Sequence, residues 1–308
     1  MKSTHKRVLF IIFDYLQNVI LMVYFTRKEN SRFAVERDNE VFMDALIAGL
    51  KEFLGFGGYQ REPEGYFSWQ HLTFVTCLMI IMAGLAIFYG LRNKNRDQRD
   101  KNRVMIVSAF LIDGFELFKL IIFSLRGNDP TTWLYNLPLF LCSIQLITIP
   151  LAAFSKGRVK EASLDFVCIF GLLGAVMGTY LAGQNYGCYP VLSLDNVVSG
   201  ITHAISGFCA LYILIAGMAS MKKKNIIITF CILFFFGIAA YIANIFTDKN
   251  YMFLLRGDGT PYDILFHLVG GHPVIYPIGV IGLFVLYIAL YYWVYFLIKS
   301  KIAKKAPV

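Results

Sequence analysis

Apolar residues along the chain gather in runs of about 20, separated by shorter polar segments. A helix of that length crosses a hydrocarbon layer of about 30 Å. The chain contains seven such runs: His71–Leu91, Val104–Leu125, Trp133–Phe154, Ser163–Ala182, Asn196–Met218, Ile226–Phe246 and Val274–Ile298. The pattern predicts an all-α protein, a polytopic membrane helix bundle with seven core transmembrane spans.

The N-terminal region has a different pattern. An eighth apolar run, Val8–Tyr24, is interrupted by Asp14 and is not followed by a small-residue cleavage site, so it fits either a retained span or a helix in the membrane interface. Val41–Phe56 has apolar residues at helical spacing, and we expect it to lie along the outer surface. We therefore divide the chain into residues 1–66, with these N-terminal helices and an outer segment, and residues 67–308, the seven-span core with a short basic tail.

Composition and charge agree with a membrane protein. The sequence is 57% hydrophobic and 16% charged, which is too apolar for an ordinary soluble domain. The net charge of +9 comes largely from Lys and Arg in alternate connections: Arg92–Arg103, Lys156–Lys160, Lys222–Lys224 and Lys299–Lys305. This asymmetry predicts a multi-pass protein of the plasma membrane with a cytoplasmic C-terminus. Since topology accounts for the basic residues, we do not expect a nucleic-acid partner.

Three ionisable residues follow one another at spacings of three within the second run. Asp113, Glu116 and Lys119 form a slanted stripe on a helix. Ionisable groups within a membrane are costly and usually face a partner or a wet cavity. We expect all three to face the bundle interior, with Glu116 paired to Lys119. The pair is either purely structural or part of a charge pathway.

The third and fifth runs carry candidate reactive groups. Cys142 follows Pro138 by about one turn, with Gln145 nearby, and His203 lies on a polar face of the fifth run with Ser199. An isolated buried cysteine usually packs as a small hydrophobe, and a buried histidine is often only hydrogen-bonded. A thiol becomes a nucleophile when a base lies at matching depth.

Depth links these residues. In the predicted orientation Glu116, Cys142 and His203 all lie roughly 10–14 Å below the outer surface. A thiol, an imidazole that removes its proton and a carboxylate that orients the imidazole form an acyl-transfer site. Gln145 and Asn244 are further polar residues expected to line the same cavity.

Two other functions compete with acyl transfer. A transporter or proton-coupled permease would use Asp113, Glu116, Lys119 and His203 as a charge pathway. A non-catalytic lipid-binding protein would use none of them chemically. The six cysteines are scattered singly, without a CxxC pair or an HExxH motif, so we expect neither a metal nor a cofactor.

Several short motifs resemble a known family. The element LPLFLC at Leu137–Cys142, with WQHL at Trp69–Leu72, FEL at Phe115–Leu117, His203 and NYMFL at Asn250–Leu254, is similar to the YwaF-like integral membrane family, which is related to eukaryotic transmembrane protein 164. The resemblance covers roughly Phe67–Ile298. It implies a seven-span bundle and, from the eukaryotic relatives, a cysteine-dependent acyltransferase acting on phospholipids or lysophospholipids. Cys142 and His203 match the family's cysteine and intramembrane histidine. Two departures are Phe140, where bacterial members usually have histidine, and His272-Pro273 in place of a Trp-Pro-Trp-like element.

Overall fold

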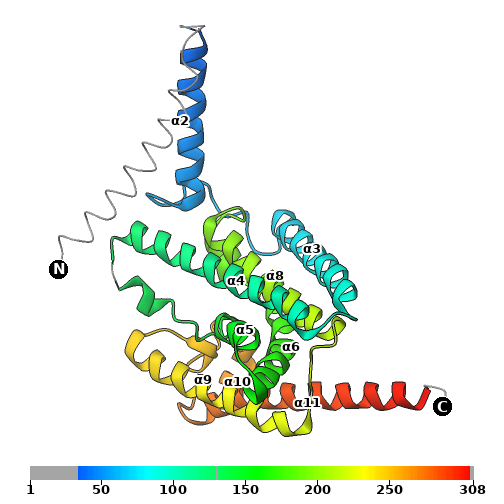
Figure 1. The fold of residues 1–308 in the computed structure, drawn as a ribbon. Helices are drawn as coiled ribbons and strands as arrows, with labels where there is room; N and C mark the ends of the chain where they lie inside the picture. Colours follow the sequence, from blue (N-terminus) through cyan, green and yellow to red (C-terminus); the bar gives the residue numbers. More distant parts are fainter. Residues whose placement is uncertain (1–33, 130, 306–308) are drawn as a thin grey trace, which may run out of the picture. The chain divides into compact units, whose positions relative to one another are not determined.

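The structure is a computed structural model, and it describes residues 34–129 and 131–305. Those residues form helices joined by turns and loops (Figure 1). They divide into two compact units, one within Met1–Lys51 and the other within Glu52–Val308. The candidate span Val8–Tyr24 lies outside the described residues.

The described part of the first unit is a helix. Helix α2, Ala34–Leu54, carries exposed apolar side chains at helical spacing, namely Phe42, Leu46, Ile47 and Leu50. Helix α2 includes residues 41–54 of the segment Val41–Phe56, while the place of that segment on the membrane surface stays a prediction. The last turn of α2 belongs to the second unit, because Glu52 accepts hydrogen bonds from the backbone N–H groups of Gln60 and Arg61.

The second unit is a helix bundle. Its α-helices are α3 (Trp69–Asn93), α4 (Gln98–Gly127), α5 (Gln145–Phe154), α6 (Gly157–Tyr180), α7 (Gly183–Cys188), α8 (Leu194–Ile215), α9 (Ile226–Thr247), α10 (Tyr262–Leu268) and α11 (Ile275–Lys305). Its 3₁₀ helices are η1 (Thr132–Tyr135), η2 (Lys223–Asn225) and η3 (Tyr251–Phe253).

Five segments in the described chain are long and apolar enough to cross a membrane, and they include α3, α6, α8, α9 and most of α11. The protein is therefore an integral membrane protein with several apolar helices. Helix α4 has 30 residues, but Asp113, Glu116 and Lys119 interrupt its apolar sequence. The count of seven spans stays a prediction.

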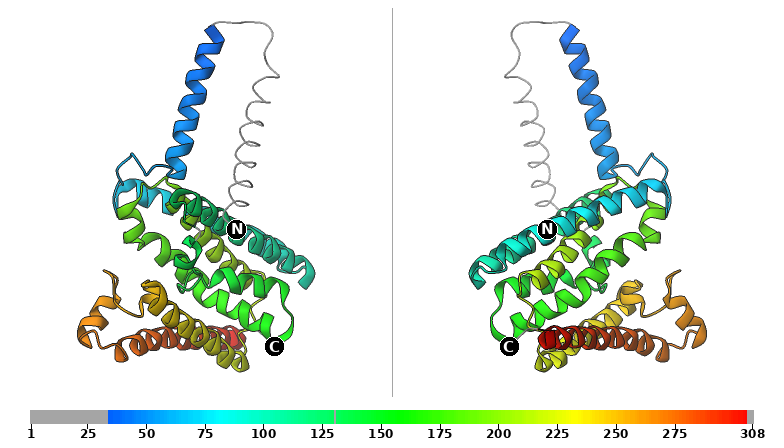
Figure 2. Two further views of the ribbon diagram at one scale, coloured as in Figure 1. Left: turned by 90° about the vertical axis from the view of Figure 1, so that its left-hand side faces the viewer. Right: turned by 90° about the vertical axis from the view of Figure 1, so that its right-hand side faces the viewer.

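Helix α6 lies at the centre of the bundle, packed against α5 and α8, and α8 also contacts α3 and α4 (Figures 1 and 2). Glycine permits the close approach of α6 to α8. A Cβ atom added at Gly171 would lie 2.6 Å from the carbonyl oxygen of Ser206. Small residues at a helix interface allow backbones to approach in this way.

The third predicted span is not one continuous helix. After η1 the chain runs through irregular turns, and the helix α5 begins only at Gln145. At about 1.5 Å per residue, α5 is only about 15 Å long. The backbone N–H of Leu137 donates to the hydroxyl of Tyr251 at 3.0 Å, so a side chain distant in sequence takes the place of a helical acceptor. The prediction of a helix over Trp133–Phe154 is wrong in its first half.

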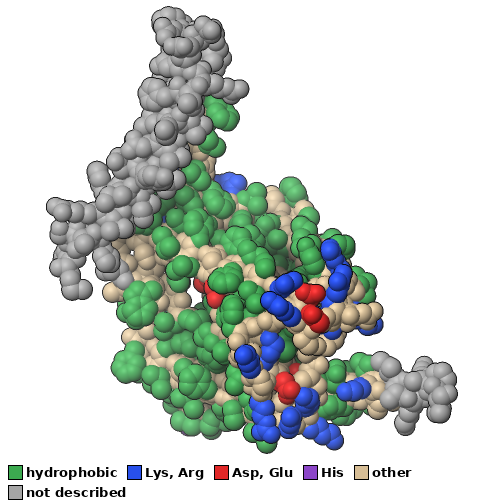
Figure 3. Space-filling view, in the orientation of Figure 1, with side chains coloured by type: hydrophobic (Ala, Val, Ile, Leu, Met, Phe, Trp, Pro, Cys, Tyr) green, Lys and Arg blue, Asp and Glu red, His purple; other side chains and the backbone are tan. Residues whose placement is uncertain are grey.

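Contacts between connections define the two ends of the bundle. At one end Lys222 pairs with Glu161 at 2.5 Å, and the ammonium of Lys160 donates to the side-chain oxygen of Asn102. The predicted cytoplasmic connections therefore meet at this end. Figure 3 shows Lys and Arg gathered on the side of the molecule where these connections lie.

The opposite end is closed by a polar cluster. Arg126, in the last turn of α4, pairs with Asp195 at the start of α8, with Nη1 and Oδ2 2.8 Å apart. The hydroxyl of Tyr59 donates to Asp195 and accepts from Arg126 at 2.9 Å. Burial and the neighbouring carboxylate raise the pKa of Tyr59 to about 12, so this hydroxyl keeps its proton.

Candidate functional site

Cys142 lies in the irregular turn that precedes α5. It is a free cysteine of intermediate exposure, and its side chain lies near that of Ser143. Gly174 of α6 faces it, since a Cβ atom added there would lie 3.4 Å from the Cys142 Cβ. In a continuous helix, the backbone N–H groups around the thiol would instead donate to helix carbonyl groups.

His203 projects from α8 towards Gly178, which lies one helical turn after Gly174 on α6. A Cβ atom at Gly178 would collide with its Nε2 atom. Its Nδ1 atom lies 2.7 Å from the carbonyl oxygen of Ser199. Because a carbonyl only accepts, Nδ1 carries the proton, and the lone pair of the neutral ring lies on Nε2.

The thiol and the imidazole lie close together over α6. Gly174 and Gly178 are one helical turn apart, and Cys142 and His203 are near enough to interact. Within residues 34–129 and 131–305, no hydrogen bond of ordinary geometry joins them, and Nε2 of His203 is buried without a hydrogen-bond partner. The arrangement places the Cys142 side chain near the Nε2 edge of the His203 ring.

The three ionisable residues in the middle of α4, Asp113, Glu116 and Lys119, do not act as one group. Glu116 and Lys119 form a partly buried ion pair with oxygen and nitrogen 2.7 Å apart, and Lys119 is near enough to His203 to interact electrostatically. Asp113 is exposed, so the expectation that it faces the interior is wrong. Two steps of three residues turn the helix by about 120°, which carries Asp113 to another face.

No carboxylate orients the imidazole through its Nδ1 atom. Glu116 was expected in that role from its depth, but the Ser199 carbonyl occupies the position and Glu116 is bound to Lys119. The expected triad of thiol, imidazole and carboxylate is therefore replaced by a thiol, an imidazole and a backbone carbonyl.

The two amide residues have different surroundings. Gln145 is buried, its Oε1 atom lies 3.0 Å from the Thr148 hydroxyl, and its Nε2 atom has no partner. Asn244 is bound at both ends to the backbone of Tyr251, at 3.1 Å through Nδ2 and 2.6 Å through Oδ1. Asn244 thus holds Tyr251 rather than presenting a free amide to a cavity.

Tyr251 connects this contact to the cysteine-bearing turn, and sequence reasoning missed it. Its hydroxyl accepts from Leu137, and its ring packs against Phe140 with centroids 5.1 Å apart. Both residues belong to the element that ends at Cys142. The motif at Asn250–Leu254 was the available signal, although a motif does not reveal which distant backbone group it binds.

Metal ligands do not gather in the described parts of the chain. Among residues 34–129 and 131–305, no three His, Cys, Asp or Glu side chains lie where they could hold one ion.

Comparisons with known proteins identify the family. A model of the TMEM164 family matches residues 66–297, about three quarters of the chain, in agreement with the extent of the motif resemblance. No curated protein and no solved structure gives a significant match. The match includes Cys142, His203 and the Asn250–Leu254 motif. The chain is therefore a member of the TMEM164 family.

Proposed function

We propose that the protein transfers or hydrolyses an acyl group of a membrane phospholipid or lysophospholipid through a thioester on Cys142. The observation that carries the proposal is that Cys142 packs on Gly174 and the Nε2 atom of His203 lies over Gly178, one turn further along α6. A thiol at such a place needs a base to become a nucleophile, and a ring nitrogen with a free lone pair can act as one.

In the first step, Nε2 of His203 takes the thiol proton as Sγ of Cys142 attacks the carbonyl carbon of a lipid ester. The carbon–sulfur bond forms, and the carbonyl electrons move onto oxygen. As the intermediate collapses, the ester carbon–oxygen bond breaks and the imidazolium returns its proton to the departing alkoxide. The products are a lysolipid and an acylated Cys142.

In the second step, a hydroxyl group of another lysolipid, or water, attacks the thioester. His203 takes the proton of that hydroxyl and then returns it to the sulfur, which leaves as the free thiol. The acceptor decides between transfer and hydrolysis. Ser143 and the Cys142 backbone N–H lie beside the sulfur, and we assign them to stabilising the developing oxyanion.

We propose a supporting role for Lys119, whose ammonium lies within electrostatic range of His203. Glu116 in turn holds Lys119 by the ion pair. We assign both as positioning residues rather than as catalytic ones.

The test is an acyl adduct on Cys142. Purified protein is incubated in vesicles of phosphatidylcholine with deuterated acyl chains, and its peptides are analysed by mass spectrometry. We expect a hydroxylamine-sensitive deuterated acyl group on Cys142. When unlabelled lysophosphatidylcholine is added, we expect phosphatidylcholine with one deuterated and one unlabelled acyl chain. Cys142→Ala is the matched control. An unmodified Cys142 together with no labelled product would contradict the proposal.

A further inference from the structure

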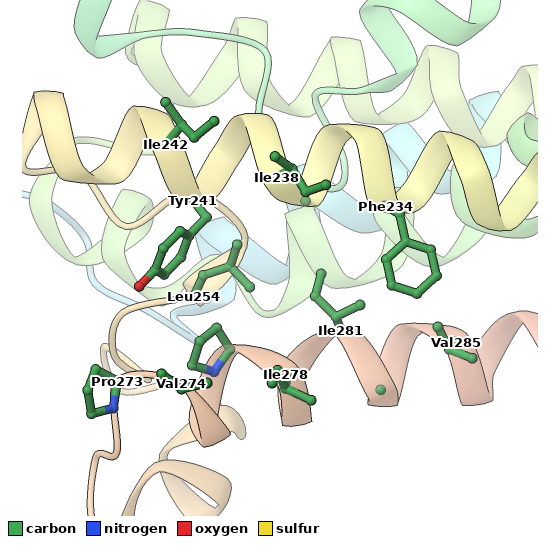
Figure 4. A pocket seen from close by; sticks show the side chains of 13 residues that line it. Phe234, Ile238, Tyr241, Ile242, Leu254, Pro273, Val274, Ile278, Ile281 and Val285 are labelled. Atoms are coloured by element: carbon green, nitrogen blue, oxygen red, sulfur yellow. The ribbon is translucent and has the colours of Figure 1, made fainter.

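A crevice lies between α9 and α11, apart from the Cys142 turn. Its volume is about 550 Å³. Phe234, Ile238 and Tyr241 line it from α9, and Ile278, Ile281 and Val285 line it from α11 (Figure 4). The volume lies in the range of small-molecule binding sites.

The lining selects a hydrocarbon ligand. The side chains that line the crevice are apolar apart from Tyr241, whose hydroxyl is the single polar side-chain atom among them. A polar solute would lose its hydration there without gaining hydrogen bonds, which is costly. A hydrocarbon chain loses nothing polar and gains contact with both helices.

The shape selects a chain rather than a compact molecule. The crevice follows the two helices from Ile242 and Val274 at one end to Phe234 and Val285 at the other. Along α9 and α11 these separations correspond to about 12–16 Å of helix. Tyr241 lies towards the end where α9 finishes and α11 begins, so an amphiphile would direct its polar end there (Figure 4).

The opening of the crevice determines the source of the chain. Both helices are long apolar segments of the kind that cross membranes, so their free surfaces face lipid. Ile238 and Ile278, on opposite sides of the crevice, are 62% and 65% exposed. A ligand therefore enters sideways from the bilayer, where phospholipid is the bulk component.

We propose that the crevice between α9 and α11 binds one acyl chain of a membrane phospholipid, with the lipid's polar end near Tyr241. This site does not depend on the chemistry of Cys142. A phospholipid bound in the crevice has a longer residence time on the protein than phospholipid on the other exposed helix faces.

Photolabelling tests the site. The full protein is placed in phosphatidylcholine nanodiscs that contain a small fraction of phosphatidylcholine with a diazirine in its acyl chain. We expect the Ile278–Val285 peptide to be labelled about fivefold more than the exposed face of α3 around Ile80 and Ile81. Equal labelling of the two surfaces would overturn the proposal, as would labelling by a diazirine fatty acid but not by the phospholipid.

Variants assign the labelling to the crevice. Gly282 lines it, and an added Cβ meets no atom within 4 Å, so Gly282→Trp fills the crevice without a clash at the backbone. Labelling should fall to the level of the α3 surface, whereas Leu283→Trp, on a different face of α11, should leave it unchanged. Val285→Phe provides a smaller obstruction if Gly282→Trp does not fold. Unchanged labelling in a folded crevice variant would refute the assignment.

Discussion

The imidazole of His203 is bound through Nδ1 to the carbonyl oxygen of Ser199, 2.7 Å away and one turn earlier on α8. This contact decides which ring nitrogen is protonated, because a carbonyl cannot donate. Nε2, the atom that faces α6, has no hydrogen-bond partner in the part of the chain that the structure describes. The orientation that the proposed base requires is therefore set by the helix that carries it.

The first prediction concerns Cys142 and His203 as a unit. Cys142→Ala should abolish lipid acyl transfer, and His203→Ala should reduce it by about 10³-fold or more, because the thiol then has no base. The double variant should be no worse than Cys142→Ala alone. Initial rates in vesicles measure this, with melting temperatures as a check on folding. Full activity in a folded His203→Ala variant would show that the imidazole is not the base.

The second prediction concerns Gly178. A methyl group at this position would collide with the His203 ring, so Gly178→Ala should move the imidazole and cost about 1–3 kcal/mol of stability together with most of the activity. Gly114→Ala, within α4, is the control because an added Cβ there meets no atom within 4 Å. Full activity in a folded Gly178→Ala variant would place the ring elsewhere.

A third prediction uses the α4 ion pair. Glu116→Ala leaves the partly buried Lys119 without its partner, so we expect a loss of about 1–3 kcal/mol, less than for a fully buried pair. The exposed Asp113 has no such role, and Asp113→Ala should not lower the melting temperature. Thermal unfolding in detergent compares the two variants. Equal effects would mean that the pair contributes nothing specific.

The fourth prediction concerns the support of the cysteine-bearing turn. Tyr251→Phe removes the hydroxyl that accepts from Leu137 and should cost about 1 kcal/mol. Because that turn positions Cys142, activity should fall further than stability does. Tyr89→Phe, a half-exposed tyrosine on α3, is the control. Unchanged acyl transfer in Tyr251→Phe would show that the contact does not position the thiol.

The fifth prediction is topological. Cys188 is exposed in α7, within a connection assigned to the outer side, so a membrane-impermeant maleimide should label it in intact cells. The variant Lys223→Cys, in a Cys188→Ala background, should react only after the membrane is opened. Labelling of residue 223 in intact cells would reverse the orientation.

The sequence was informative where periodicity and local chemistry decide the structure. Apolar runs located α3, α6, α8, α9 and α11 because span length and composition suffice there. The break before α5 was not predictable, since it depends on a contact between Leu137 and the distant Tyr251. The pairing of Glu116 with Lys119 follows from their spacing, whereas the exposure of Asp113 depends on how α4 is rotated.

The short length of α5 affects how the chain is assembled in the membrane during synthesis. A segment with only ten helical residues does not offer the translocon a complete apolar helix, and the irregular backbone before it needs partners that lipid cannot provide. One of these, Tyr251, is separated from Leu137 by 114 positions. The turn that carries Cys142 is therefore completed only after α9 and η3 have been made, so the surroundings of this thiol form late in biogenesis.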